Sequence, residues 1–452
     1  MNRHSILRRA ALPLLVIGAC ATWWAQAQTT VTPPAASSMP ARPATAGASA
    51  PPAVPPGPAP IVTVPGMPPV VDPLNLYSET VATRLSPNVA GALERVYVPN
   101  RGHNTVSVID PATLKVLSVF PVGINPQHVV PSYDLKTLWV ANNAEGRTDG
   151  SLTPIDPLTA KPGKSIPVDD PYNMYWSPDG QYAIIVAEAY KRLDFRDPKT
   201  MELKYSIATP ECDGINHADF SIDGRIAFFT CEFNGAITKI DLVKRSVIGT
   251  LKLSAYFNRP DILATISAPG KKLPQRIPDP AELGATICTV PGMPQDVRAS
   301  PDGKTLFIAD MMVDGVHVVD GESFKQIGFI PTGIGAHGLY PSRDGKQLYV
   351  ANRGSNLVRG KPNGPGSVSV INFATRKVTV TWPIPGGGSP DMGNVSADGK
   401  HLWLSGRFDG VVYRFDTSNG AVDKVKVGRE PHGLTVWPQP GRYSLGHTGN
   451  LR

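Results

Sequence analysis

Four histidines and two aspartates occupy equivalent points of an internal repeat, at the start of successive apolar strands. They are His128, His217, His337 and His432, together with Asp296 and Asp391. Imidazole and carboxylate groups that converge from separate repeats can bind a transition metal or orient a polar ligand. The metal hypothesis takes the four histidines as ligands and one aspartate as a base. No local ligand spacing such as HxxxH enforces coordination, so bonds to neighbouring backbone or to water remain the structural alternative.

Three arginines fall in loops that the same repeat brings to the same face: Arg101, Arg353 and Arg407. Arginines that point at a shared opening suit a carboxylate or phosphate ligand, because guanidinium binds such groups through two parallel hydrogen bonds. The alternative is that they form salt bridges with Glu188, Glu232 or Asp310 of neighbouring loops.

The common catalytic signatures are absent from the sequence. It contains no GxSxG elbow, no P-loop, no HExxH and no CxxCH haem-attachment motif. Cys212 and Cys231 flank one strand pair and form a disulfide candidate, while Cys288 is an alternative partner for Cys212. No catalytic residue is therefore assigned, and a binding protein is favoured over an enzyme.

The elements that must position these residues repeat about every 44 residues. Seven short apolar strands end in an acidic or amide residue and a turn, at Asp110, Asp156, Asp197, Asp241, Asp320, Asn372 and Asp416. Asp-Gly pairs connect the first and second strands of most units and predict tight hairpins. The strand-ending carboxylates are interpreted as turn residues that bond nearby backbone, not as catalytic acids.

Five segments resemble those of a known family: the strands VYVPN (96–100), LYVAN (348–352) and VSVID (106–110), the turn SPDGK (300–304) and the segment PHGL (431–434). They resemble the YVTN-repeat (YncE-like) beta-propellers of bacterial envelopes over about residues 90 to 440. The resemblance implies an all-β, seven-bladed beta-propeller of four-stranded antiparallel blades. Lactonases, haem-d1 domains and quinoprotein dehydrogenases use related propellers, so the resemblance is specific for the fold and not for the function.

Both chain ends are expected to complete one blade, with GLTVW near Leu434 pairing with VYVPN. The strand RYSLGHTGN (442–450) is then left over, and it either extends that closure or begins an eighth blade. The longer insertions, at about 254–289, at SNLVRGKPNGPG (355–366) and around Glu145 to Gly150, all fall on one face. Insertions in repeat proteins commonly mark the binding face, and the six histidines and aspartates lie on that face around the channel mouth.

Residues 1–27 read as a signal peptide, with Arg3, Arg8 and Arg9 before an apolar run and Ala25-Gln26-Ala27 as the cleavage site. A lipoprotein-like site before Cys20 would instead leave a lipid anchor at that cysteine. Residues 28–73 read as a Pro/Ala-rich disordered linker and residues 74–452 as the propeller domain. The expected location is the periplasm or the medium, with a lipid-anchored envelope protein as the alternative.

Removal of the three signal arginines reduces the net charge from +7 to +4. The mature chain has neither a basic patch typical of nucleic-acid binders nor an apolar run long enough to cross a membrane. The sequence thus predicts a binding or scaffold module whose partner is an envelope protein or a small anionic ligand, without a cofactor. The alternative is a metal- or cofactor-dependent hydrolase or oxidoreductase, lactonase-like or haem-d1/quinoprotein-like, that uses the channel mouth.

Overall fold

The computed structural model describes residues 59–145, 147, 149–254, 292–359, 362–447 and 449–452. The predicted signal peptide, the linker up to residue 58, Cys20, Cys288 and nearly all of the 254–289 insertion lie outside the described residues.

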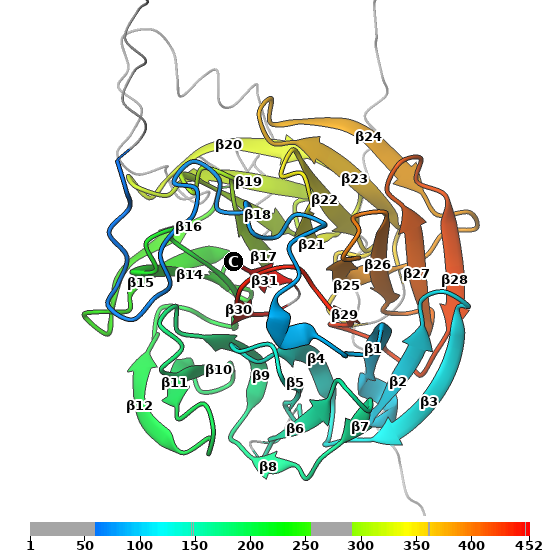
Figure 1. Ribbon diagram of the computed structural model, residues 1–452. Coiled ribbons are helices and arrows are strands. Elements are labelled where there is room, and N and C mark those ends of the chain that lie inside the picture. The colour runs from blue at the N-terminus through cyan, green and yellow to red at the C-terminus, as the bar shows by residue number, and fades with distance from the viewer. Residues whose placement is uncertain (1–58, 146, 148, 255–291, 360–361, 448) are drawn as a thin grey trace, which may run out of the picture. The chain divides into compact units, whose positions relative to one another are not determined.

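Seven antiparallel sheets surround a central axis, so the predicted seven-bladed propeller is confirmed (Figure 1). The blade closed by both ends contains β29 (Thr435–Trp437), β1 (Arg95–Asn100), β2 (Thr105–Asp110) and β3 (Lys115–Pro121). The next contains β4 (Pro126–Pro131), β5 (Leu138–Asn142), β6 (Ser151–Asp156), β7 (Lys161–Pro162) and β8 (Ile166–Pro167). The third contains β9 (Pro171–Trp176), β10 (Ala183–Ala187), β11 (Arg192–Arg196) and β12 (Leu203–Ala208). The fourth contains β13 (Ile215–Phe220), β14 (Ile226–Cys231), β15 (Ala236–Asp241) and β16 (Ser246–Lys252).

The fifth blade contains β17 (Pro294–Ala299), β18 (Thr305–Asp310), β19 (Gly315–Asp320) and β20 (Lys325–Pro331). The sixth contains β21 (Ala336–Pro341), β22 (Gln347–Asn352), β23 (Ser367–Asn372) and β24 (Lys377–Pro383). The seventh contains β25 (Pro390–Val395), β26 (His401–Gly406), β27 (Val411–Asp416) and β28 (Val422–Lys426). Two 3-10 turns, η1 (Pro87–Val89) and η2 (Arg101–His103), are the only helical elements of the described chain, and neither is long and apolar enough to cross a membrane.

The first and last strands of the repeat meet in one blade, as the sequence predicts. Strand β29 pairs with β1, with Val436 opposite Val96. The leftover segment forms β30 (Ser444–Gly446) and β31 (Asn450–Leu451), and it neither extends this closure nor begins an eighth blade. Instead, Gly446 pairs with Tyr175 on the inner edge of β9, so the two short strands lie near the propeller axis (Figure 1). We call residues 438–452 the C-terminal tail.

The strand-ending carboxylates are turn residues, as the sequence indicates. Asp110 Oδ1 accepts a hydrogen bond from the backbone N–H of Ala112 at 2.9 Å, and Asp156 Oδ1 accepts one from Leu158 at 2.8 Å. The carboxylates therefore set where the third strand of a blade ends and are not available for chemistry.

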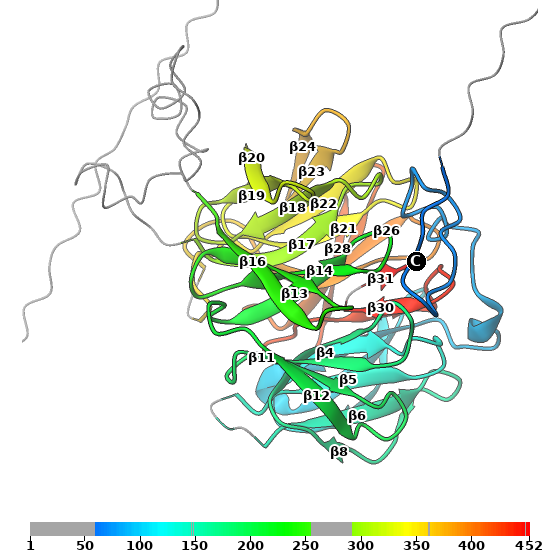
Figure 2. The same cartoon turned by 90° about the vertical axis from the view of Figure 1, so that its left-hand side faces the viewer.

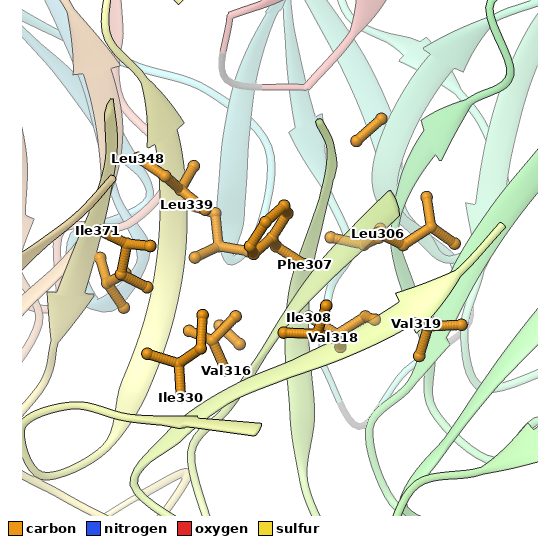
Figure 3. Close-up of a cluster of buried hydrophobic side chains, with 14 of the residues drawn as sticks. Leu306, Phe307, Ile308, Val316, Val318, Val319, Ile330, Leu339, Leu348 and Ile371 are labelled. Carbon is orange, nitrogen blue, oxygen red and sulfur yellow. The ribbon is translucent and has the colours of Figure 1, made fainter. Parts of the chain in front are cut away.

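The hydrophobic core lies between blades, because the second strands are apolar on both faces. Figure 3 shows one such interface: Ile308, Val316 and Val318 of the fifth blade form one buried cluster with Leu339, Leu348 and Ile371 of the sixth. A propeller buries apolar surface on both sides of every sheet in this way, which explains the unbroken apolar sequence of these strands.

The segment before β1 lies across the Asp-Gly turns of several blades, on the face that Figure 1 presents. Its contacts begin earlier than the predicted boundary at residue 74. The backbone N–H of Val64 donates to the carbonyl of Asp223 at 3.0 Å, and Met67 is 9% exposed. Residues 59–73 therefore belong with the propeller in this respect. The composition of the segment does not reveal this, because the backbone groups and apolar surface that it contacts belong to the turns.

A disulfide joins Cys212, which precedes β13, to Cys231 at the end of β14, with the two Cα atoms 4.9 Å apart. Replacing both cysteines by alanine should lower the free energy of unfolding by about 3 kcal/mol, the usual effect of opening a loop of this size. Urea denaturation of wild type and variant under oxidising conditions measures the difference. A reducing agent should shift the wild type to the variant's midpoint and leave the variant unchanged; equal midpoints without reductant would contradict the prediction.

Candidate functional site in the axial channel

Six of the seven inner strands shift register at the point where the candidate residues lie. In β13, Ile215 pairs with Cys231 and Ala218 with Phe229, so Asn216 and His217 together face one residue of β14. The inner strands β17, β21 and β25 repeat this two-against-one pairing, and β4 and β9 shift register at the same point. Bulges re-aim side chains, and here they allow two consecutive residues of each strand to line the channel.

The channel lining therefore has two tiers that differ by one residue along the strand. The first tier contains Gln127, Tyr172, Asn216, Gln295, His337, Asp391 and His432. The second tier contains His128, Asn173, His217, Asp296, Gly338, Met392 and Gly433. The four predicted histidines are divided between the tiers, and no candidate metal group contains more than two of them, although the ring centroids of His128 and His432 lie 4.8 Å apart.

Asp391 is the centre of the first-tier group. Its Oδ1 lies 3.0 Å from His337 Nδ1, its Oδ2 lies 3.5 Å from His432 Nε2, and Arg353 Nη2 lies 3.3 Å from Oδ2. All four side chains are buried. Burial raises the pKa of Asp391, while Arg353 and Arg407 oppose that rise. Burial, followed by nearby positive charge, lowers the pKa of both histidines, which are therefore neutral at pH 7.

The second-tier group contains His128, His217 and a residue that the sequence analysis missed, His447 of the C-terminal tail. The ring centroid of His447 lies 4.5 Å from that of His128 and 4.2 Å from that of His217. Gly433 makes room for this group, because a Cβ atom there would lie 1.9 Å from His128 Nδ1. Burial, and then Arg407, lowers the pKa of His128 to about 3. The pKa values of His217 and His447 are lowered by burial as well.

Two contacts hold the tail in place beneath this group. The Arg452 guanidinium donates to Asp219 Oδ1 at 2.6 Å, and Asn450 Nδ2 donates to the carbonyl of Ala218 at 3.2 Å. The surplus strand that fitted no blade was the available sequence signal for this role. It did not reveal that the segment runs back to the axis.

Asp296 does not join either group, although it occupies a second-tier position. Its Oδ1 accepts from the backbone of Val297 and from Arg298, and its Oδ2 accepts from the backbone of Leu339 in the next blade at 2.9 Å. Burial raises the pKa of Asp296 to about 6, with Arg298 the main opposing charge. Its contacts are those of a link between the fifth and sixth blades.

Two glutamates stand beside the first tier, Glu232, which is buried, and Glu188, which is partly buried. Glu232 accepts hydrogen bonds from Asn216 Nδ2 at 2.8 Å and from Gln295 Nε2 at 3.1 Å. Burial raises the pKa of Glu232, and it raises that of Glu188 well above the ordinary value with Glu232 as the next cause. Both glutamates are candidates for holding a proton inside the channel.

The three candidate arginines have different partners. Arg101 pairs with Glu145 and Glu430, and Arg353 pairs with Asp391. Arg407 is 6% exposed and makes no ion pair within the described chain, where its Nη1 also lacks a hydrogen-bond acceptor. The described chain forms no salt bridge from any of these three arginines to Glu188, Glu232 or Asp310, which was the alternative interpretation.

A cavity of about 390 Å³ opens beside Arg407. Its lining consists of Arg101, Asn125, Glu145, Val358, Arg359, Arg407, Phe408 and Glu430. Glu145 and Arg359 come from two of the predicted insertions and form an ion pair across the cavity. Insertion residues and a channel-mouth arginine thus share one concave surface.

The fold and the buried polar channel define a seven-bladed beta-propeller with an axial site. The family model of the YNCE-like beta-propellers matches residues 57–212 and 286–440, and the chain belongs to this family. None of the curated proteins compared with this sequence matches it.

Solved structures with the same fold include several enzymes. Hydrazine synthase of Kuenenia stuttgartiensis is 18% identical over 68% of this chain and 87% of its own, with a TM-score of 0.50. Dihydro-heme d1 dehydrogenase NirN in complex with DHE is 14% identical over 84% of this chain and 79% of its own, with a TM-score of 0.52. A putative 6-phosphogluconolactonase from Bacteroides uniformis is 16% identical over 75% of this chain and 98% of its own, with a TM-score of 0.52. Similarity at this level of identity concerns the fold alone.

Proposed function

We propose that this propeller is an exported binding protein of the bacterial envelope that takes a small anionic ligand in the cavity at its channel mouth. The observation that carries the proposal is the buried guanidinium of Arg407, which lines that cavity without a carboxylate partner in the described chain.

The charges of the cavity favour an anion. Its lining contains three arginines and two glutamates. Both glutamates pair with Arg101, and Glu145 also pairs with Arg359, which leaves Arg407 without an ion-pair partner among the lining residues. A buried charge without a partner is costly, and a carboxylate or phosphate would supply two charge-assisted hydrogen bonds.

The size and location of the cavity agree with this role. Its volume of about 390 Å³ falls within the range of small-molecule sites. Phe408 and Val358 provide apolar contact beside the charged groups. The export signal predicted in residues 1–27 and the Cys212–Cys231 disulfide support an oxidising compartment such as the periplasm.

The test is calorimetric titration of tag-free protein with phosphate, sulfate, acetate, succinate and citrate. We expect at least one of these anions to bind, and Arg407→Gln to weaken that binding by 100-fold or more, because the variant loses the unpaired charge. Arg359→Gln is the matched control: Arg359 lines the same cavity but is exposed and paired with Glu145, so its loss should cost less than 10-fold. Equal affinity of Arg407→Gln and wild type, or no binding of any anion, would refute the proposal.

The second candidate is a metal-dependent hydrolase or oxidoreductase, which the His337, Asp391 and His432 group favours. Two histidines and one carboxylate are a common ligand set for metals that keep open coordination positions. Arg353 already neutralises Asp391, and this pairing is the reason the binding function ranks first. Turnover of a lactone, a quinone or nitrite that His337→Ala abolishes would favour the enzyme instead.

A further inference from the structure

We infer that His128, His217 and His447 form a site for one transition-metal ion of the Zn²⁺ or Cu²⁺ class, with the C-terminal tail supplying the third ligand. The inference goes beyond the anion site, which requires no metal and involves none of these three side chains.

The three imidazoles are already arranged around one point. Their candidate ligand atoms all lie within 4.8 Å of one another. Ligand nitrogens around a tetrahedral Zn²⁺ are roughly 3.4 Å apart, given bonds of about 2.1 Å. Small ring rotations, with shifts of roughly 1 Å, would therefore bring the three nitrogens into coordination distance.

The hydrogen bonding of the group points to a missing ligand. Both ring nitrogens of His128, both of His447 and Nε2 of His217 are buried and have no hydrogen-bond partner in the described chain. Buried polar atoms in native proteins are almost always satisfied by protein, water or an ion. Five such nitrogen atoms lie on three adjacent rings, and no group of the described chain satisfies them.

The chemistry of the group favours an ion over water alone. The buried rings are neutral at pH 7, and neutral imidazole is the form that binds transition metals. Imidazole nitrogens suit Zn²⁺ and Cu²⁺, and three protein ligands leave a fourth position open. The positive charge of Arg407 acts on His128 and opposes a cation, so we expect an anion such as hydroxide in that fourth position.

The position of His447 makes the site depend on the tail. His128 comes from β4 and His217 from β13, which belong to different blades. His447 follows the single pairing of Gly446 with Tyr175 of β9, in the blade between them. An ion bound to all three rings would therefore join the tail to two blades and stabilise its docking.

His217 also requires one local adjustment. Its Nδ1 lies 2.9 Å from the side-chain nitrogen Nδ2 of Asn173. Because Nδ2 donates to Nδ1, the ring proton of His217 lies on Nε2. Coordination through Nε2 moves the proton to Nδ1, which then needs an oxygen acceptor. Asn173→Asp supplies such an oxygen, and we expect it to bind the metal at least as tightly as wild type.

The experiment uses full-length mature protein without a histidine tag, stripped with a chelator and titrated separately with ZnCl₂ and CuCl₂. We expect one tightly bound ion per chain by calorimetry and elemental analysis. His447→Ala and His447→Gln should each weaken binding by 100-fold or more. In the Cu²⁺ form, electron paramagnetic resonance should show one coupled nitrogen fewer in these variants. His401→Ala, which changes a half-buried histidine of β26 outside the channel, should bind as wild type does.

Two outcomes decide against the proposal, and two variants keep its test specific. Failure to bind either ion in stoichiometric amount overturns it. Loss of binding in His337→Ala, with binding retained in His447→Ala, would assign the ion to the first-tier group. His447→Gln keeps a polar side chain, so unchanged circular dichroism together with lost binding separates ligation from misfolding. Arg407→Gln should retain the ion, which keeps failure of this site distinct from failure of the anion site.

Discussion

The channel histidines should lower the free energy of unfolding as the pH falls from 6.5 to 5 in buffer containing a chelator. Five channel histidines, at 128, 217, 337, 432 and 447, have pKa values that burial lowers, in the case of His128 to about 3. In the unfolded chain the same imidazoles titrate near pH 6.5.

The direction of this effect follows from proton binding in the two states. Below about pH 6.5 the unfolded chain takes up protons that the folded channel excludes, so acid favours unfolding and stability rises with pH across this window. Each imidazole that stays neutral in the fold contributes about 1.4 kcal/mol per pH unit. Together the five histidines can remove several kcal/mol within one unit. The channel carboxyls Asp296, Asp391, Glu188 and Glu232 oppose this loss, because burial raises their pKa values and they take up protons in the fold.

Urea denaturation at pH 7.5, 6.5, 5.5 and 5.0 measures the effect directly. His128→Gln should reduce the pH dependence by about one imidazole's share, since glutamine does not titrate in this range. An identical pH dependence of the free energy of unfolding in His128→Gln and wild type would show that His128 charges as readily in the fold as in the unfolded chain.

Asp391→Ala should lower the free energy of unfolding by about 3–5 kcal/mol, because it leaves the Arg353 guanidinium buried and without its carboxylate. Arg353 is 2% exposed and Asp391 is fully buried, so solvent cannot take the place of the lost partner. Asp391→Asn keeps an oxygen acceptor and should lose less stability than Asp391→Ala.

The matched control is Asp423→Ala on β28 of the same blade. Asp423 pairs with Arg414, but its side chain is 52% exposed, and exposed pairs contribute less than about 1 kcal/mol. Chemical denaturation of the three variants and the wild type decides the matter. Similar losses for Asp391→Ala and Asp423→Ala would mean that the channel ion pair is solvated in solution.

The fold could be predicted from the sequence because its signals are local. The turn carboxylates, the Asp-Gly hairpins and the apolar second strands each depend on a few consecutive residues. The pairing of β29 with β1 was predictable too. The repeat pattern leaves the first blade without an inner strand, and a strand from the end of the repeat can supply it.

The grouping of the channel residues was less accessible, because it depends on geometry between blades. The repeat places His128 and His337 in one ring, but the bulges put them in different tiers. Asp296 and Asp391 look equivalent in sequence. However, Asp296 accepts hydrogen bonds from Arg298 and from the backbone of Leu339, while Asp391 faces two histidines. His447 belongs to no repeat, so no register could place it.

The bulge in the inner strands has a consequence for how such a channel can change. A regular strand would send every second side chain away from the axis, whereas the bulge gives each blade two adjacent positions that line it. These positions also contact the next blade: Met392 packs in an interblade cluster, and a Cβ atom at Gly433 would lie 1.9 Å from His128 Nδ1. The chemistry of the axial surface therefore depends on neighbouring blades together, and a change in one blade must be accommodated by a side chain of the next.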